Sequence, residues 1–300
     1  MTVLELIEAG ASRLDAAGVS FGHGTTNAFD EAAWLVLWRL DLPLDDLDGV
    51  AAREVAPVES VEVEALIEQR ITTRRPTAYL TGEAWLQGLP FFVDARAIVP
   101  RSLIAEVIAD GTVDAFLATP PRRVLDLCTG NGSLAVLAAL AWPAAGVDAT
   151  DLSADALAVA ARNVGRHGLQ RRIALRQGDA LAAAAGAYDL ILCNPPYVNR
   201  AAMAALPPEY RAEPALALDG GSDGGDDGMD LVRRLLRDAP GHMRPDAVLV
   251  LEIGHEKPHF DAAFPRLQSV WLPTSAGESQ LLLLTRDALV SDDAVSAGTA

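Results

Sequence analysis

The 300-residue sequence predicts an α/β protein, in which a small N-terminal helical bundle and a connecting β-hairpin precede a doubly wound parallel sheet. From about residue 122, short apolar runs typical of strands alternate with helical segments, as they do in parallel sheets covered by helices. Residues 1–75, in contrast, carry apolar residues at helical spacing with no strand pattern between them. We therefore expect a helical domain over 1–75, a hairpin linker over 76–100, an α/β domain over 101–288 and a disordered tail over 289–300.

The N-terminal part is expected to hold three helices. In the second of these, Asn27 is a candidate N-cap. The side chains predicted to form its apolar face are Phe29, Ala33, Trp34, Leu37 and Trp38. In the linker, aromatic and aliphatic residues alternate with Gly82, Gly88 and Pro90, which predicts short strands joined by turns.

The apolar runs of the α/β part predict its strands. The expected parallel strands are 124–128, 146–151, 173–176, 188–193 and 247–253, and the expected closing antiparallel pair is 270–272 with 280–285. Helices are expected over 133–142 and 154–167. Ser153 can cap the second of these helices and Gly168 can end it. Between the expected strands 188–193 and 247–253, the Gly/Asp run 219–230 is expected to be a solvated flexible loop.

Composition and charge exclude several classes of protein. No apolar stretch approaches the roughly 20 residues of a membrane helix, and the N-terminus lacks the basic region of a secretory signal. We therefore expect no membrane association and a cytoplasmic location. The net charge of −17 argues against strong nucleic-acid binding and favours a basic protein partner. The two cysteines, Cys128 and Cys193, are expected to be buried thiols rather than a disulfide framework.

Three segments predict a nucleotide-like cofactor site. The first is the strand-to-helix turn that contains Asp126, Thr129, Gly130 and Gly132, where glycine lets the backbone approach a ligand closely. Asp151 ends the next strand, 21 residues after Gly130, a spacing that suits hydrogen bonds to ribose hydroxyls.

The third segment follows the third strand, where Asp179, next to Ala180, can accept a hydrogen bond from an adenine amino group. These segments leave both NAD and S-adenosylmethionine open. Position 135 is alanine, so the turn lacks the full G-x-G-x-x-G spacing. This makes NAD the less favoured of the two cofactors.

The tetrapeptide Asn194-Pro195-Pro196-Tyr197 follows the fourth strand, which neighbours the first strand at the switch point of such a sheet. Two prolines make the loop rigid. The side-chain oxygen of Asn194 and the main-chain oxygen of Pro195 can accept the two N–H groups of a planar amide, while Tyr197 packs on its face. This arrangement orients the nitrogen lone pair toward a sulfonium methyl group, which favours S-adenosylmethionine over NAD.

With these motifs, DLCTGNG, DLS and NPPY, the chain resembles the bacterial protein-(glutamine-N5) methyltransferases. The segments 21–31, 78–85, 88–94 and 206–214 resemble the branch that acts on large-subunit ribosomal protein L-three, rather than the branch that acts on class I peptide release factors. Ser102-Leu103 stands where that branch is expected to have Ser-Pro. The resemblance covers residues 3–288, and implies a Rossmann-like class I methyltransferase domain.

By this resemblance, the turn residues, Asp151, Asp179, Ala180 and Asn194 bind S-adenosylmethionine and its product S-adenosylhomocysteine. Asn194, Pro195, Pro196 and Tyr197 bind the substrate glutamine, and the N-terminal bundle recognises the protein. No metal is expected, because Pro258 interrupts the H-E-x-x-H pattern at 255–259. The alternatives are glutamine methylation of release factors, an adenine amino methyltransferase of nucleic acid, and a non-catalytic ribosome assembly factor.

Overall fold

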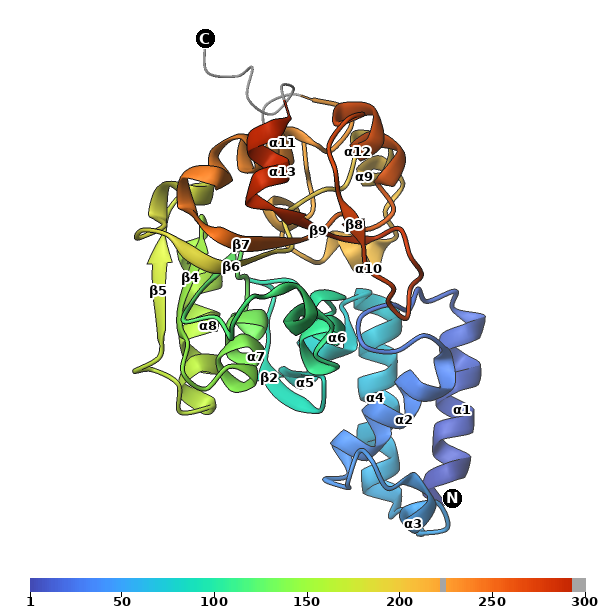
Figure 1. Cartoon of the computed structure of the whole chain (residues 1–300). Helices are drawn as coiled ribbons and strands as arrows, with labels where there is room; N and C mark the ends of the chain where they lie inside the picture. The colour runs from blue at the N-terminus through green and yellow to red at the C-terminus, as the bar shows by residue number, and fades with distance from the viewer. Residues whose placement is uncertain (222–224, 293–300) are drawn as a thin grey trace.

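The computed structural model describes residues 1–221 and 225–292, and it confirms the α/β fold class with the N-terminal bundle and the hairpin (Figure 1). The central sheet has the strand order β5-β4-β3-β6-β7-β9-β8. Strands β3 to β7 are parallel, and β9 and β8 complete the sheet in antiparallel pairing. The bounds are Arg123–Leu127 for β3, Gly146–Asp151 for β4, Ile173–Gln177 for β5, Tyr188–Cys193 for β6, Met243–Glu252 for β7, Val270–Trp271 for β8 and Leu281–Thr285 for β9.

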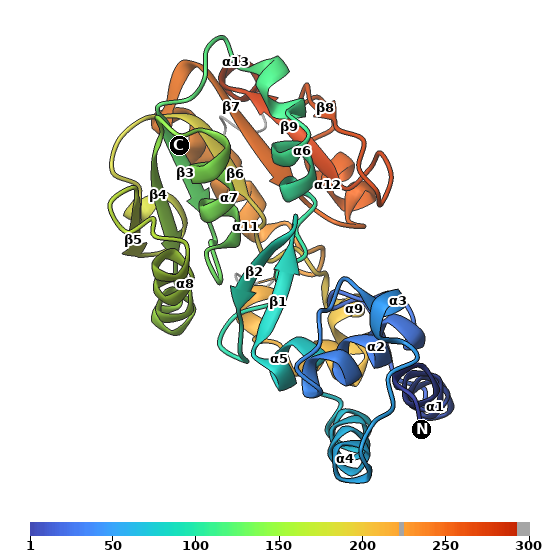
Figure 2. The ribbon, with the colours of Figure 1, turned by 90° about the horizontal axis from the view of Figure 1, so that it is seen from below.

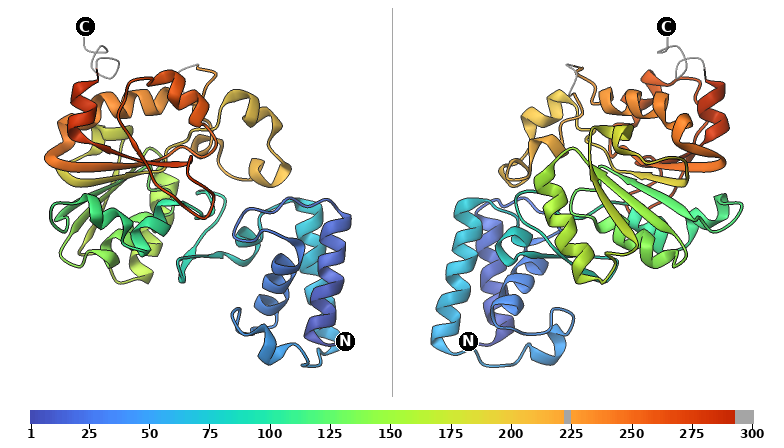
Figure 3. Two further views of the ribbon diagram at one scale, coloured as in Figure 1. Left: turned by 45° about the vertical axis from the view of Figure 1, so that its right-hand side comes forward. Right: turned by 90° about the vertical axis from the view of Figure 1, so that its left-hand side faces the viewer.

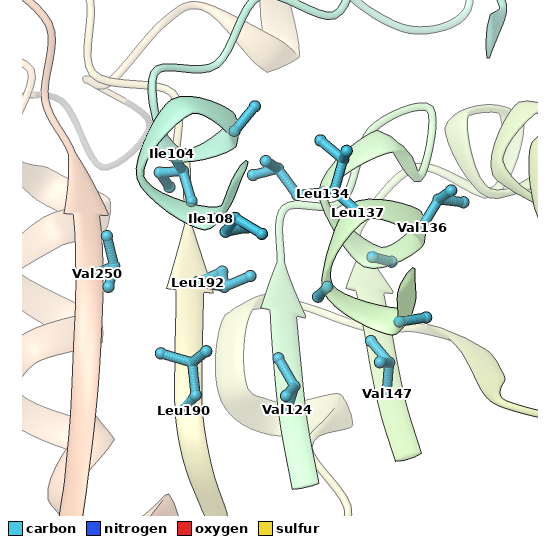
Figure 4. Close-up of a cluster of buried hydrophobic side chains, with 14 of the residues drawn as sticks. Ile104, Ile108, Val124, Leu134, Val136, Leu137, Val147, Leu190, Leu192 and Val250 are labelled. Carbon is cyan, nitrogen blue, oxygen red and sulfur yellow. The ribbon is translucent and has the colours of Figure 1, made fainter. Parts of the chain in front are cut away.

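Helices cover both faces of this sheet. On one face, Ile104 and Ile108 of α6 and the apolar side chains of α7 pack onto strand residues such as Leu192 (Figure 4). On the other face, α11, α12 and α13 bury a second apolar cluster that includes Val232 and Phe260. The helices of these layers are α6 (Ile104–Ala109), α7 (Ser133–Ala141), α8 (Ala154–Arg166), α11 (Asp230–Asp238), α12 (Lys257–Ala263) and α13 (Arg286–Ser291). The predicted cap forms, because the Ser153 side chain accepts from the Ala156 N–H.

The N-terminal helices stand beside the sheet layers as a separate column (Figure 3). They are α1 (Val3–Ala16), α2 (Ala28–Arg39), the short α3 (Leu47–Val50) and α4 (Pro57–Thr73). Asn27 caps α2 and Leu37 is buried, as predicted, but the predicted apolar face is wrong for Phe29 and Trp38. Phe29 and Trp38 are 39% and 37% exposed, whereas Leu35 and Val36 are fully buried. Apolar residues lie around most of the circumference of α2, and packing on α1 and α4 decides which of them are buried.

A short helix and a hairpin connect the bundle to the sheet (Figure 2). They are α5 (Thr77–Thr81), β1 (Glu83–Leu86) and β2 (Leu89–Phe92). Gln87 and Gly88 form the two-residue turn with φ values of 49° and 72°, as a type I′ hairpin turn requires. The buried Asn163 amide of α8 fixes this hairpin, because its Oδ1 accepts from the Phe92 N–H at 2.7 Å and its Nδ2 donates to the Phe92 carbonyl at 2.9 Å.

A segment between β6 and α11 reaches back to the N-terminal bundle. It comprises α9 (Arg200–Ala205), α10 (Pro208–Arg211) and a 3-10 turn (Ala215–Ala217), and it lies above the bundle in Figure 3. At the other end of the chain, α13 extends to Ser291 and buries Leu289. The prediction of a disordered tail is therefore wrong for 289–291, because Leu289 packs into the second apolar cluster. Residues 293–300 lie outside the described residues.

Candidate active site

Buried polar groups within the turn after β3 fix its conformation. Asp126 is fully buried and accepts hydrogen bonds from the Thr129 hydroxyl and, at 2.9 Å, from the Ala135 N–H. Burial raises the pKa of Asp126 to about 7. Gly132 precedes α7 with φ at 81°, and a Cβ on it would lie 3.1 Å from the Ala160 Cβ. Asp126, Thr129 and Gly132 therefore support the turn from its buried side. None of the three lines the cavity described below.

Gly130 and Asp151 meet at the carboxyl ends of β3 and β4. The Gly130 N–H donates to Asp151 Oδ2 at 2.9 Å, and the Ser153 N–H donates to Oδ1 at 2.8 Å. Gly130 has φ at 55°, and a Cβ on it would meet nothing within 4 Å. Burial raises the pKa of the Asp151 carboxyl, and this effect outweighs the backbone hydrogen bonds, which lower the pKa. The turn therefore presents open space beside a carboxylate whose oxygens each keep capacity for another donor.

A first cavity lies over these strand ends. Of the predicted cofactor residues, Gly130, Asp151, Asp179, Ala180 and Asn194 line it together. Asp179 accepts a hydrogen bond from Arg234 of α11 at 2.9 Å, a partner that the sequence did not indicate. Further lining residues that the prediction omitted include Cys128, Leu152, Ala97, Ile98, Pro214 and Leu231. Cys128 and Leu152 adjoin predicted residues, whereas Ala97, Ile98, Pro214 and Leu231 come from segments far from them in the sequence, which explains the omission of these four.

A second cavity adjoins the first at the predicted catalytic tetrapeptide. Asn194 lines both cavities, Pro196 lines the first, and Pro195 and Tyr197 line the second. The strand pairing explains this position, because β6 lies beside β3 and both strands end at the same edge of the sheet. The structure thus brings the four residues of the tetrapeptide to the boundary between two cavities.

The Tyr197 ring is held by close packing on Gly254. A Cβ on Gly254 would lie 2.6 Å from Cε2 and 2.9 Å from the hydroxyl oxygen of Tyr197. Burial raises the pKa of the Tyr197 phenol, and the negative charge of Glu252 raises it further. Glu252, at the end of β7, also lines the second cavity, and it was not predicted from the sequence.

The described part of the Gly/Asp run is packed at Gly220 and Gly228, which are buried, and exposed at Asp219 and Asp226. The Gly220 N–H donates to the Val198 carbonyl at 3.1 Å, and the Arg200 N–H donates to the Asp226 carbonyl at 3.2 Å. Gly228 is buried against the Tyr197 carbonyl, where a Cβ would lie 2.2 Å from that oxygen. The prediction of a solvated flexible loop is wrong for Gly220 and Gly228, because the run packs there along the chain that follows the tetrapeptide.

Two buried glutamates join the second cavity to the N-terminal bundle. Glu209 accepts from the Ser20 N–H at 3.2 Å and from Arg74 at 3.2 Å. Glu213 accepts from Arg101, which lines the second cavity, and lies 3.4 Å from His23 Nε2. His23 is 2% exposed, and its ring packs at a tilt against Tyr210 with the ring centroids 4.3 Å apart.

Among residues 1–221 and 225–292 there is no cluster of three or more His, Cys, Asp or Glu side chains suited to a metal ion. Within the same residues, no helix combines the length and apolar character that a membrane crossing requires.

Comparison with known proteins gives a consistent result. Residues 111–206 match the family model "Methyltransferase small domain". The chain is 58% identical to the ribosomal protein uL3 glutamine methyltransferase of Bordetella pertussis over 96% of both chains, and 51% identical to that of Burkholderia pseudomallei over 94% of both. Among solved structures, a methyltransferase from Pyrococcus furiosus is similar with a TM-score of 0.50 and 19% identity, covering 67% of this chain and 90% of that one. This last likeness concerns the fold alone.

Proposed function

The chain belongs to the family of ribosomal protein uL3 glutamine methyltransferases, and from this premise we propose that it transfers a methyl group from S-adenosylmethionine to the side-chain nitrogen of a glutamine on ribosomal protein uL3. The observation that carries the proposal is the position of Asn194 between the two cavities. One cavity suits a nucleoside with a charged tail, and the other suits a planar amide. The reaction requires the two ligands to meet at such a boundary.

The first cavity fits S-adenosylmethionine, which supplies an electrophilic methyl group when it is bound. The Asp151 oxygens, each with one backbone donor, can accept the ribose hydroxyls. The space over Gly130 leaves room for the ligand beside the turn. Asp179, oriented by Arg234, and the neighbouring Ala180 would bind the adenine. Asp126, Thr129 and Gly132 support the turn, and no residue of this site requires a metal.

The second cavity fits the glutamine amide. The Asn194 side-chain oxygen and the Pro195 main-chain oxygen accept its two N–H groups, Tyr197 packs against its face, and Pro196 separates the amide site from the cofactor site. These two acceptors hold the nitrogen lone pair toward the first cavity and stabilise the positive charge that develops on nitrogen. The excess proton then leaves the methylated amide for solvent.

The partner is expected to be a basic ribosomal protein, because the net charge of −17 favours association with a basic surface. The N-terminal bundle is the proposed recognition domain. Glu209 and Glu213 connect it to the walls of the second cavity, so a protein bound on the bundle would have its glutamine presented to a fixed site. This activity would take place in the cytoplasm, where ribosomal proteins are made.

The test is methyl transfer from labelled S-adenosylmethionine to purified uL3 and to a class I release factor, each with its target glutamine and with alanine in its place. We expect label on uL3 that disappears in the glutamine-to-alanine variant. Label on the release factor alone would support the proposed reaction but show that the release factor, and not uL3, is the substrate. Label on neither protein would overturn the proposed function.

A further inference from the structure

Tyr210 of α10 lines the second cavity, and the proposed reaction leaves its ring without a role. The empty volume of this cavity is about 950 Å³, solvent at its mouth included. Pockets that enclose a whole small molecule have volumes of about 300–1,000 Å³, so the amide of one side chain fills only part of this space. A glutamine within a protein enters together with the peptide groups on either side of it. The cavity therefore has room for the main chain that flanks the glutamine.

The N-terminal bundle sets the position of the Tyr210 ring. The His23 ring packs at a tilt against it, with the two centroids 4.3 Å apart. Gly22 lies at the hydroxyl end of the tyrosine, where a Cβ on the glycine would come within 2.2 Å of the hydroxyl oxygen. Both residues belong to the loop between α1 and α2. A loop of the bundle thus fixes a side chain in the wall of the second cavity.

Further contacts hold α10 and its tyrosine in place. The central guanidinium carbon of Arg101 lies over the Tyr210 ring, 5.5 Å from its centroid, and Arg101 also lines the cavity. The adjacent residue Glu209 is fully buried and accepts from the Ser20 N–H and from Arg74, both at 3.2 Å. An aromatic ring that is fixed before binding loses little conformational freedom when a ligand packs on it.

We propose that Tyr210 is a specificity-determining residue, whose ring is positioned by the N-terminal bundle and contacts the main chain that flanks the target glutamine. The inference rests on the proposed function, and it adds a contact that the amide-binding tetrapeptide does not supply. Tyrosine is among the side chains that carry most of the binding energy at protein interfaces. The bundle then acts on the substrate within the cavity, in addition to recognising the protein on its own surface.

The first test compares Tyr210→Leu with Tyr210→Phe, measured as kcat and KM for uL3 at saturating S-adenosylmethionine. Leucine removes the ring, whereas phenylalanine retains it. We expect Tyr210→Leu to raise KM at least tenfold, roughly the loss of one strong interface contact, with kcat and the affinity for S-adenosylhomocysteine within about twofold. Tyr210→Phe should leave all three within about twofold. Phe116→Leu is the matched control, because Phe116 is 37% exposed and lies outside the lining of the second cavity.

A binding measurement separates contact with the flanking main chain from contact with the amide. Calorimetric titration is carried out with S-adenosylhomocysteine present, using uL3 and a uL3 variant whose target glutamine is alanine. Tyr210→Leu should weaken the binding of both forms of uL3 by the same factor, because its partner is the main chain. Asn194→Ala should weaken only the form that carries the glutamine. A loss in Tyr210→Leu that disappears with the glutamine would overturn the inference and assign the ring to the amide.

The role of the bundle is tested from the glycine loop. In Gly22→Ala the new Cβ would overlap the Tyr210 hydroxyl oxygen at 2.2 Å, whereas the nearest ring carbon is 3.3 Å away. We therefore expect Gly22→Ala to raise KM for uL3 about fivefold or more by displacing the ring, and the added change Tyr210→Phe to restore KM to within about twofold of Tyr210→Phe alone. Gly24→Ala is the control, because Gly24 also has a positive φ but its Cβ would approach Trp34.

An unchanged KM in folded Tyr210→Leu would overturn the inference and leave the proposed function intact, because wild-type activity is measured in the same assay. If Tyr210→Leu does not fold, the Gly22 variants decide. A KM in Gly22→Ala that equals wild type, or that Tyr210→Phe fails to restore, would then overturn the inference. A wild-type enzyme that fails to methylate uL3 would overturn the proposed function and this inference with it.

Discussion

Arg101 donates two parallel hydrogen bonds to Glu213, with Nη1 to Oε1 and Nη2 to Oε2 both at 2.7 Å. The same carboxylate accepts the Val99 N–H at 2.9 Å and lies 3.4 Å from the buried His23 ring. Three stretches of chain therefore meet on one side chain: the N-terminal bundle, the start of the catalytic domain and the segment after the tetrapeptide. Such bidentate pairs fix geometry as well as charge.

This cluster predicts a pH-dependent contribution of Glu213 to stability. Burial alone would raise the pKa of Glu213, but the Arg101 charge and the two hydrogen bonds from Arg101 lower it from 4.5 to about 2. The stabilisation is therefore present above pH 4.5 and is lost as the pH falls toward 2. Glu213→Gln should lower the free energy of unfolding by about 3 kcal/mol at pH 7. In denaturant titrations, a difference from wild type that does not shrink between pH 4.5 and pH 2 would contradict this.

Asn194→Ala is expected to leave the fold intact and to reduce turnover at least ~100-fold, because one preorganised acceptor for the amide is lost. Asn27→Ala is the matched control. Asn27 only caps α2, so its removal should cost about 1 kcal/mol of stability with turnover unchanged. Steady-state methyl transfer checks both, and activity of the Asn194 variant within threefold of wild type would remove its assigned role.

Asp151→Ala is expected to weaken the binding of S-adenosylmethionine far more than the binding of the protein substrate. The variant loses the proposed ribose acceptor and also the group that accepts from the Gly130 N–H. Asp155→Ala, which removes an exposed acid in the next helix, should change neither affinity. Calorimetric titration with each ligand measures the two effects, and equal losses in both would contradict a ribose contact.

Gly254→Ala is expected to lower kcat by at least tenfold, because the new Cβ would overlap the Tyr197 ring and displace it. Gly168→Ala is the matched control. Gly168 has a similar positive φ of 68° but no atom within 4 Å of the Cβ position, so it should cost about 1 kcal/mol of stability and leave kcat unchanged. Equal kcat in the two alanine variants would mean that the packing of Tyr197 does not matter for turnover.

Asn163→Ala is expected to lower the free energy of unfolding by about 3 kcal/mol and to release the hairpin. It removes the two hydrogen bonds to Phe92 and a third, from Nδ2 to the Asn131 carbonyl at 2.8 Å. Amide hydrogen exchange at Phe92 reports the release directly. Unchanged protection of that amide would show that the hairpin is held by its apolar contacts alone.

Sequence reasoning was accurate wherever the determining interactions are local. Strand β4 has the predicted bounds, and Ser153 and Asn27 cap their helices as expected. Alternation of strands and helices then fixes which strands are neighbours, so it also predicted that the tetrapeptide would lie at the same sheet edge as Gly130 and Asp151. These features depend on residues within a few positions of one another, and on one rule of topology.

The same reasoning failed where an apolar pattern was ambiguous. In α2, apolar residues lie around most of the helix, so periodicity alone does not show that Phe29 and Trp38 are the exposed ones. The Gly/Asp run has a composition typical of solvated loops, yet Gly228 is buried against the Tyr197 carbonyl. In both cases a partner distant in the sequence decides which atoms are buried, and that partner leaves no local signal.

The sequence by itself determined the sheet, the glycine turn after β3 and the position of the tetrapeptide after β6, because periodicity, caps and motif spacing are encoded over short ranges. Only the tertiary structure decided that Asn194 separates two cavities, that Glu252 meets Ser102 across 150 positions and that Glu213 meets Arg101 across 112. The physical reason is that a buried carboxylate selects its partners by geometry and desolvation in the folded chain, and neither is expressed in the order of the residues.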